Sequence, residues 1–376
     1  MLANNSTPRI YIAATHQDVG KTTSCIGLVS SLKKRYPKIG YTKPVGQRFV
    51  EFDGHKVDED SVLIGQTYQV ELPLDAMSPI TIGPDFTRKY LSGEVESNMV
   101  HIVQEAFNRV AWEHDFVVIE GTGHAGVGSV LDLSNARVAS ALNSKVIIVS
   151  QGGIGRPVDE VALNAALFHK QGVEVAGVIV NKVLPEKIDK LRPLLHKAFD
   201  SMGFPLLGLI PLNSELPKPT LNQVCDVLKG TFVAGEQMRG RWVDRVVIGA
   251  ASSRNADIYF HQGALIITAG DREDLILTIM EACDDNPELN ISGVVLTQGF
   301  LPQAGLLKIM KSRPVPFISV PYDSYTAASR INSMTVKTEL GNQTKIHLIQ
   351  EMFENNVDVE AIIQTAKMPE SVNKSF

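Results

Sequence analysis

Residues 14–23 have the composition of a segment that binds a chain of phosphates. They read ATHQDVGKTT, follow an apolar stretch and precede a helical pattern. A glycine-containing loop between a strand and a helix turns backbone N–H groups and the helix N-terminus toward phosphates. Lys21 would neutralise the β- and γ-phosphate oxygens, and the Thr22 hydroxyl would bind Mg²⁺. The segment predicts a P-loop for Mg-ATP or a similar nucleotide, with cofactor-binding residues Val19, Gly20, Lys21, Thr22 and Thr23.

One position departs from the usual GxxxxGK[ST] pattern, because Thr15 stands where the first glycine is expected. A loop that only turns a corner is the alternative interpretation. The run of Gly, Lys, Thr and Thr directly after a strand favours phosphate binding.

Acidic and amide residues elsewhere could complete such a site. Glu120 ends the apolar run 116–119, and the strand beside a P-loop usually ends in an acidic residue that reaches the metal. The run from Asp58 to Ser61 could bind metal or simply begin a helix, where carboxylates are favourable. Asn181 follows an apolar strand, and its amide could contact a nucleotide base. The sequence after it lacks the Asp of a guanine-reading motif.

Short apolar runs alternate with helical patterns along the whole chain. In the first half the runs cover 9–14, 115–120, 145–149 and 175–180, with a candidate edge strand at 204–211. Near-continuous apolar strands are typical of a parallel sheet covered by helices. We therefore expect an α/β fold, in which a P-loop NTPase parallel sheet has helices on both faces.

A segment rich in proline and glycine, 213–241, predicts a domain boundary. We expect a P-loop domain at 1–213 and a second, smaller α/β domain at 214–376, with strands near 245–249, 263–268, 293–297 and 315–320. Apolar residues from Ile346 to Ile363 recur at helical spacing. These C-terminal helices either pack on the second domain or form a dimer contact.

The composition excludes several classes of protein. The net charge is only −5, and Lys and Arg are scattered, so we expect neither nucleic acid nor membrane as a partner. Cys25, Cys225 and Cys283 lie too far apart in the sequence for a disulfide framework or a zinc motif. No apolar run approaches the roughly 18 residues of a membrane span, and no signal peptide is recognisable. We expect a cytoplasmic protein.

Several motifs together resemble the dethiobiotin synthetase family of P-loop enzymes over residues 8–212. They are the loop 14–23, Lys43-Pro44-Val45, Asp60-Ser61, Ser78-Pro79, residues 118–123 and residues 178–181. The resemblance implies that Lys21 and Lys43 are the catalytic residues that contact the γ-phosphate or an acyl phosphate. It further implies that Thr22, Asp60 and Glu120 hold Mg²⁺ and that Asn181 contacts adenine. Residues 120–124 read EGTGH where this family usually has EGAGG, so biotin synthesis is not predicted.

The second half resembles the DRTGG domain. The similar segments are 268–274, 296–300, 315–320 and 325–328, although Gln298 replaces a glycine of that motif. This pairing of domains is similar to the N-terminal regulatory region of long-form phosphate acetyltransferases. The sequence has no acetyl-transfer domain, so we do not expect that activity from it.

Two functions remain open at this stage. The chain is either a nucleotide-responsive regulatory module that controls a partner enzyme, or an ATP-dependent ligase that activates a carboxylate or carbamate. ATP and Mg²⁺ are the expected cofactors in both cases. A small-molecule carboxylate or amine would be the substrate of the ligase, and we expect a homodimer.

Overall fold

The computed structural model describes residues 2–70, 72–95, 98–286 and 288–368, and these divide into two compact units. Unit 1 contains the described residues up to Asn213 and those from Glu339 onward. Unit 2 extends from Ser214 to Thr338. The expected boundary at 213/214 therefore marks the start of unit 2, but the assignment of residues 339–368 to the second domain was wrong.

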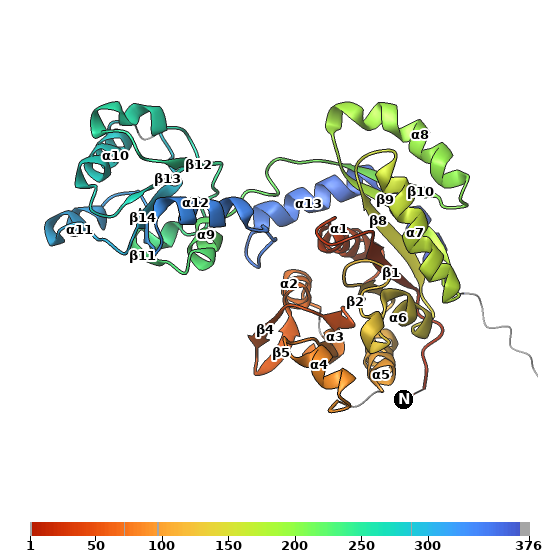
Figure 1. The fold of residues 1–376 in the computed structure, drawn as a ribbon. Helices are drawn as coiled ribbons and strands as arrows, with labels where there is room; N and C mark the ends of the chain where they lie inside the picture. Colours follow the sequence, from red (N-terminus) through yellow and green to blue (C-terminus); the bar gives the residue numbers. More distant parts are fainter. Residues whose placement is uncertain (1, 71, 96–97, 287, 369–376) are drawn as a thin grey trace, which may run out of the picture. The chain divides into compact units, whose positions relative to one another are not determined.

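A six-stranded sheet forms the centre of unit 1, in the order β10-β9-β8-β1-β7-β2, and every pair in it is parallel (Figure 1). β1 is fully buried, and β7 is buried on both sides, as expected for near-continuous apolar runs. The predicted edge strand is confirmed as β10. The strands are β1 (Arg9–Ala14), β2 (Ile39–Thr42), β7 (Phe116–Glu120), β8 (Lys145–Gln151), β9 (Val175–Val183) and β10 (Leu206–Pro211).

Helices cover both faces of this sheet, as expected. Helix α1 contacts both C-terminal helices, α13 and α14. From α5 to α8, each helix contacts the next one along the chain. Smaller pairs are β3 (Val45–Gly46) with β6 (Ile80–Thr81), and β4 (Phe49–Phe52) with β5 (His55–Asp58). The helices are α1 (Lys21–Lys33), α2 (Glu59–Tyr68), α3 (Leu74–Met77), α4 (Phe86–Leu91), α5 (Met99–Trp112), α6 (Asn135–Ala141), α7 (Arg156–Lys170), α8 (Ile188–Asp200), α13 (Gln343–Asn356) and α14 (Val359–Ala366).

The C-terminal helices pack against the helix that follows the P-loop. Phe353 of α13 lies directly over Gly27 of α1, and a Cβ at position 27 would overlap its ring. Ile349 and Phe353 are 1% exposed. These apolar side chains are buried within their own chain, so they do not supply the dimer contact that was one expectation. The homodimer itself stays a prediction.

Unit 2 is the second, smaller α/β unit that the sequence predicted. Its sheet has the order β11-β15-β14-β13-β12, and β11 alone runs antiparallel to its neighbour. Arg272 forms an ion pair with Asp274 (2.8 Å) at the start of α10. The elements are α9 (Leu221–Val227), β11 (Thr231–Ala234), β12 (Arg245–Ile248), β13 (Ala264–Ala269), α10 (Glu273–Asp285), β14 (Gly293–Thr297), α11 (Ala304–Met310), β15 (Phe317–Ser319) and α12 (Ser324–Ser333). In the described part of both units, each helix is too short or too polar to cross a membrane.

Candidate functional site

The P-loop turns from β1 into α1 at the carboxyl edge of the sheet. β1 ends at Ala14, and α1 begins at Lys21. Gly20 has φ 109°, a left-handed conformation that favours glycine, and a Cβ there would overlap the Asn181 side chain. The first N–H groups of α1 have no partner within the helix. They give this edge the anion-attracting character that a phosphate site requires.

Lys21 and Thr22 occupy the first turn of α1. The Lys21 ammonium donates to the His16 carbonyl at 3.4 Å, within the same loop. Burial lowers the pKa of Lys21, and the Lys43 charge lowers it further, while Glu120 opposes the shift. The Thr22 hydroxyl donates to Glu120 Oε1 at 2.9 Å. The loop therefore brings a partly desolvated cation and a hydroxyl to the end of β7.

Glu120 is the last residue of β7, which lies between β1 and β2, and it is 1% exposed. Its second oxygen, Oε2, accepts from the Tyr41 hydroxyl at 2.8 Å. Burial raises the pKa of Glu120, and the nearby Asp60 raises it further. Both oxygens of this carboxylate thus have fixed donors from neighbouring strands and helices.

Lys43 follows β2 and is surrounded by carboxylates. Its ammonium donates to Asp58 Oδ1 at 2.8 Å, contacts Asp60 Oδ2 and lies 4.0 Å from Glu120 Oε1. Although burial alone lowers the pKa of Lys43, Glu120, Asp60 and Asp58 raise it above its ordinary value. Lys43 is therefore charged and acts as the internal counter-ion of this cluster.

Asp58 is a part of the site that sequence reasoning did not select. It is fully buried, and its Oδ1 also accepts from the Asp60 N–H at 3.0 Å, as the N-cap of α2. Its Oδ2 has no hydrogen-bond partner among the described residues. Burial raises the pKa of Asp58 against the opposing effect of Lys43. The sequence did contain a signal for Asp58, because it is the first residue of the acidic run from which only Asp60 was predicted as a metal ligand.

The predicted magnesium ligands Thr22, Asp60 and Glu120 meet at one place. Thr22 touches Glu120, and Asp60 is linked to it through Lys43. Hydroxyl and carboxylate oxygens are the donors that Mg²⁺ prefers, and Asp58 Oδ2 adds a buried oxygen that lacks a donor. Within the described residues, no three His, Cys, Asp or Glu side chains are arranged to enclose a metal unaided. The donor types fit Mg²⁺ held jointly with phosphate oxygens and water.

Asn181 supports the loop from β9. Its Nδ2 donates to the Val19 carbonyl at 2.8 Å, and its Oδ1 accepts from the Lys182 N–H. The side chain is only 4% exposed. In this structure Asn181 fixes the turn before Gly20. Its expected contact with adenine stays a prediction.

Comparison with known families follows the division into two units. A family model described as an AAA domain, AAA_26, matches residues 8–220, and one described as a DRTGG domain matches residues 223–334. The chain belongs to the AAA_26 family. The AAA_26 match begins just before β1 and includes every strand of the six-stranded sheet. In the DRTGG match, Gln298 has φ 64°, a conformation that favours the glycine of the motif.

The curated relatives include phosphate acetyltransferases. The enzyme of Nitrosomonas europaea is 26% identical over 375 residues, which cover 96% of this chain and 52% of its own length. That of Pseudomonas aeruginosa is 26% identical over 385 residues, with 97% and 53% covered. The chain thus spans about half the length of the curated relatives it matches.

Two solved structures show more distant likeness. The CBS and DRTGG domains of a Clostridium perfringens pyrophosphatase, complexed with diadenosine tetraphosphate, share 19% identity and a TM-score of 0.27 over 36% of this chain and 63% of that one. MinD from Pyrococcus horikoshii, complexed with Mg-ADP, shares 17% identity and a TM-score of 0.32, with 56% and 83% covered.

Proposed function

We propose that unit 1 of this AAA_26 protein binds Mg-ATP and that the chain is a nucleotide-responsive regulatory module. The observation that carries the first part is the convergence of Lys21, Thr22, Lys43, Asp60 and Glu120 at the P-loop edge of the sheet. Lys21 and Lys43 would contact the phosphates, while Thr22, Asp60 and Glu120 would hold Mg²⁺. The metal would neutralise phosphate charge there.

The path of the chain supports the regulatory part. Unit 2 is inserted between β10 and α13, and these two elements contact each other in unit 1. α13 also packs along α1, the helix whose first turn carries Lys21 and Thr22. A shift of α1 on nucleotide binding would therefore move the segment through which the chain returns from unit 2. Such coupling requires that ATP binds two states with different affinity.

The proposed partner is an enzyme. The shared name of the curated relatives makes a phosphate acetyltransferase the first enzyme to test, either as a separate chain or within a longer one. A homodimer and a cytoplasmic location complete the proposal. Light scattering of the purified chain measures the first of these.

Binding is tested by thermal unfolding with Mg-ATP. At about one hundred times its dissociation constant, ATP should stabilise unit 1 by about 2.7 kcal/mol. Lys21→Ala should lose most of this stabilisation, because the phosphates lose their nearest ammonium. Lys145→Ala is the matched control, since Lys145 forms an exposed ion pair with Glu174 on the same sheet. Equal stabilisation of both variants would refute the site.

Turnover separates the module from a ligase that activates a carboxylate or carbamate. ADP release is measured with and without pooled small carboxylates and amines, and again with Glu120→Gln. Hydrogen exchange of α13 is followed in parallel with and without Mg-ATP. Binding without turnover, together with changed protection of α13, supports regulation. Substrate-dependent ADP release with unchanged protection would overturn it in favour of the ligase.

A further inference from the structure

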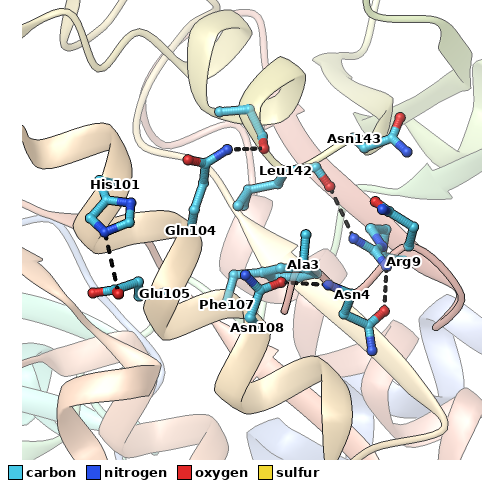
Figure 2. A pocket seen from close by; sticks show the side chains of 12 residues that line it. Ala3, Asn4, Arg9, His101, Gln104, Glu105, Phe107, Asn108, Leu142 and Asn143 are labelled. Atoms are coloured by element: carbon cyan, nitrogen blue, oxygen red, sulfur yellow. Dashed lines mark hydrogen bonds and ion pairs between the residues drawn. The ribbon is translucent and has the colours of Figure 1, made fainter. Parts of the chain in front are cut away.

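A cavity lies at the opposite edge of the unit 1 sheet from the P-loop. It has a volume of about 230 Å³ and is lined by Arg9, Gln104, Asn108 and Asn143, among others (Figure 2). Arg9 is the first residue of β1, whose other end leads into the P-loop. At about 3.3 Å per residue, the strand separates the two places by roughly 20 Å. The cavity is therefore a separate feature from the nucleotide site.

Arg9 is a buried cation without an anionic partner. It is 2% exposed, and its guanidinium lies 4.7 Å from the centre of the Phe107 ring. Nε donates to the Thr7 carbonyl (3.0 Å), Nη1 to the Leu142 carbonyl (3.1 Å) and Nη2 to Asn4 Oδ1 (2.8 Å). All three acceptors are neutral. In the described ranges of the chain, no carboxylate forms an ion pair with Arg9.

This arrangement leaves donors for a ligand. A guanidinium has five N–H donors, and the three bonds above use three of them. Asn108 Oδ1 accepts from the Asn4 N–H at 2.8 Å, which leaves the Asn108 amide N–H groups available. Burial lowers the pKa of Arg9 to about 10, so the group is still charged at neutral pH. A buried charge is costly unless an opposite charge accompanies it.

The one carboxylate that lines the cavity lies at its exposed rim. Glu105 Oε1 is 3.3 Å from His101 Nε2, and both side chains are more than half exposed. Figure 2 shows this pair on the far side of the cavity from Arg9. The rest of the lining contains one cation, Arg9, together with neutral amides and apolar side chains such as Phe107 and Leu142.

We propose that this cavity binds a small oxyanion, a phosphate or a carboxylate group, through Arg9 and the amide of Asn108. The oxyanion supplies the counter-charge that the protein does not provide. Phosphate and carboxylate share the required chemistry, since each offers oxygens that accept two parallel N–H bonds from a guanidinium.

The test is calorimetric titration with inorganic phosphate and, separately, with acetate, at ionic strength matched with chloride. The protein carries Lys21→Ala so that the P-loop does not take up the phosphate. Asn108→Asp still accepts the Asn4 N–H bond but adds a carboxylate to the lining of the cavity, and we expect it to weaken anion binding by at least about tenfold. Glu105→Gln removes a negative charge from the lining of the same cavity, and we expect it to strengthen anion binding at low salt.

The stronger of the two anions identifies the class of the natural ligand. Arg9→Gln should abolish binding, and if that variant does not fold, Asn108→Asp and Glu105→Gln decide the question. The proposal is overturned if neither anion binds to the Lys21→Ala protein. It is also overturned if Asn108→Asp binds anions as tightly as its parent.

Discussion

Replacing Lys43 by methionine tests whether the buried charges at the P-loop edge depend on its ammonium. Lys43 contacts Asp58 and Asp60 and lies 4.0 Å from Glu120. Methionine keeps much of the side-chain length but leaves these three carboxylates without that cation. Removing one partner of a buried ion pair costs about 3–5 kcal/mol. Since about 1 kcal/mol shifts Tm by roughly 2–4 °C in a domain of this size, we expect Tm to fall by roughly 6–20 °C.

The pH dependence of stability provides a second test of this prediction. Burial raises the pKa of Glu120 and of Asp58 even while Lys43 is present. A carboxyl group with a raised folded-state pKa stabilises the fold fully below its unfolded pKa, and this contribution is lost as pH rises through the folded pKa. Without Lys43 these pKa values rise further. The deficit of Lys43→Met against the wild type should therefore be larger at about pH 8 than at about pH 5.

Thermal unfolding of both proteins across this pH range is the assay. Lys145→Met is the control, because its ion pair with Glu174 is exposed and should contribute at most about 1 kcal/mol. Added MgCl₂ should stabilise Lys43→Met more than the wild type, since the carboxylates lack a cation. The reasoning fails if Lys43→Met unfolds at the same temperature as Lys145→Met, or if its deficit grows as the pH falls.

Two further substitutions test the helix contact and the loop support. Gly27→Ala should destabilise unit 1 by about 1–3 kcal/mol, because the new Cβ overlaps Phe353; Gly305→Ala, in open space on α11, should be neutral or stabilising in the same thermal assay. Asn181→Ala removes the bond to the Val19 carbonyl and should weaken ATP and inorganic triphosphate equally, by about 1 kcal/mol in a binding titration. Loss of ATP affinity alone would instead indicate an adenine contact.

Much of the fold could be predicted because its information is local. The strand at Arg9–Ala14 has the limits expected from its apolar run, and a helix follows the P-loop as expected. Buried parallel strands are mostly apolar, so the longer ones, β1, β7, β8 and β9, are visible in the sequence. β2 was not predicted, because Ile39–Thr42 has only four residues and no long apolar run. Its position beside β7 is set by tertiary pairing.

The position of the C-terminal helices could not be read from their own residues. The spacing of Ile346, Ile349 and Phe353 predicts an apolar helix face but does not identify what covers it. That face is covered by α1, where Gly27 leaves room for the Phe353 ring. A glycine within a helix costs stability, so this one is explained by the close packing that it permits. That relationship joins residues more than 300 positions apart and has no local signal.

Lys43 and the carboxylates around it add a buried ion-pair cluster to the P-loop. With Lys21, the cluster contains two cations and the three carboxylates Asp58, Asp60 and Glu120, and an unpartnered oxygen remains on Asp58. While Lys43 neutralises the carboxylates, its ammonium is not free for a phosphate. If these carboxylates held Mg²⁺, the metal would replace Lys43 as their counter-charge, and the Lys43 ammonium would become available to phosphate oxygens. Metal and nucleotide would thus raise each other's affinity through one lysine, and binding linkage requires this effect to be reciprocal.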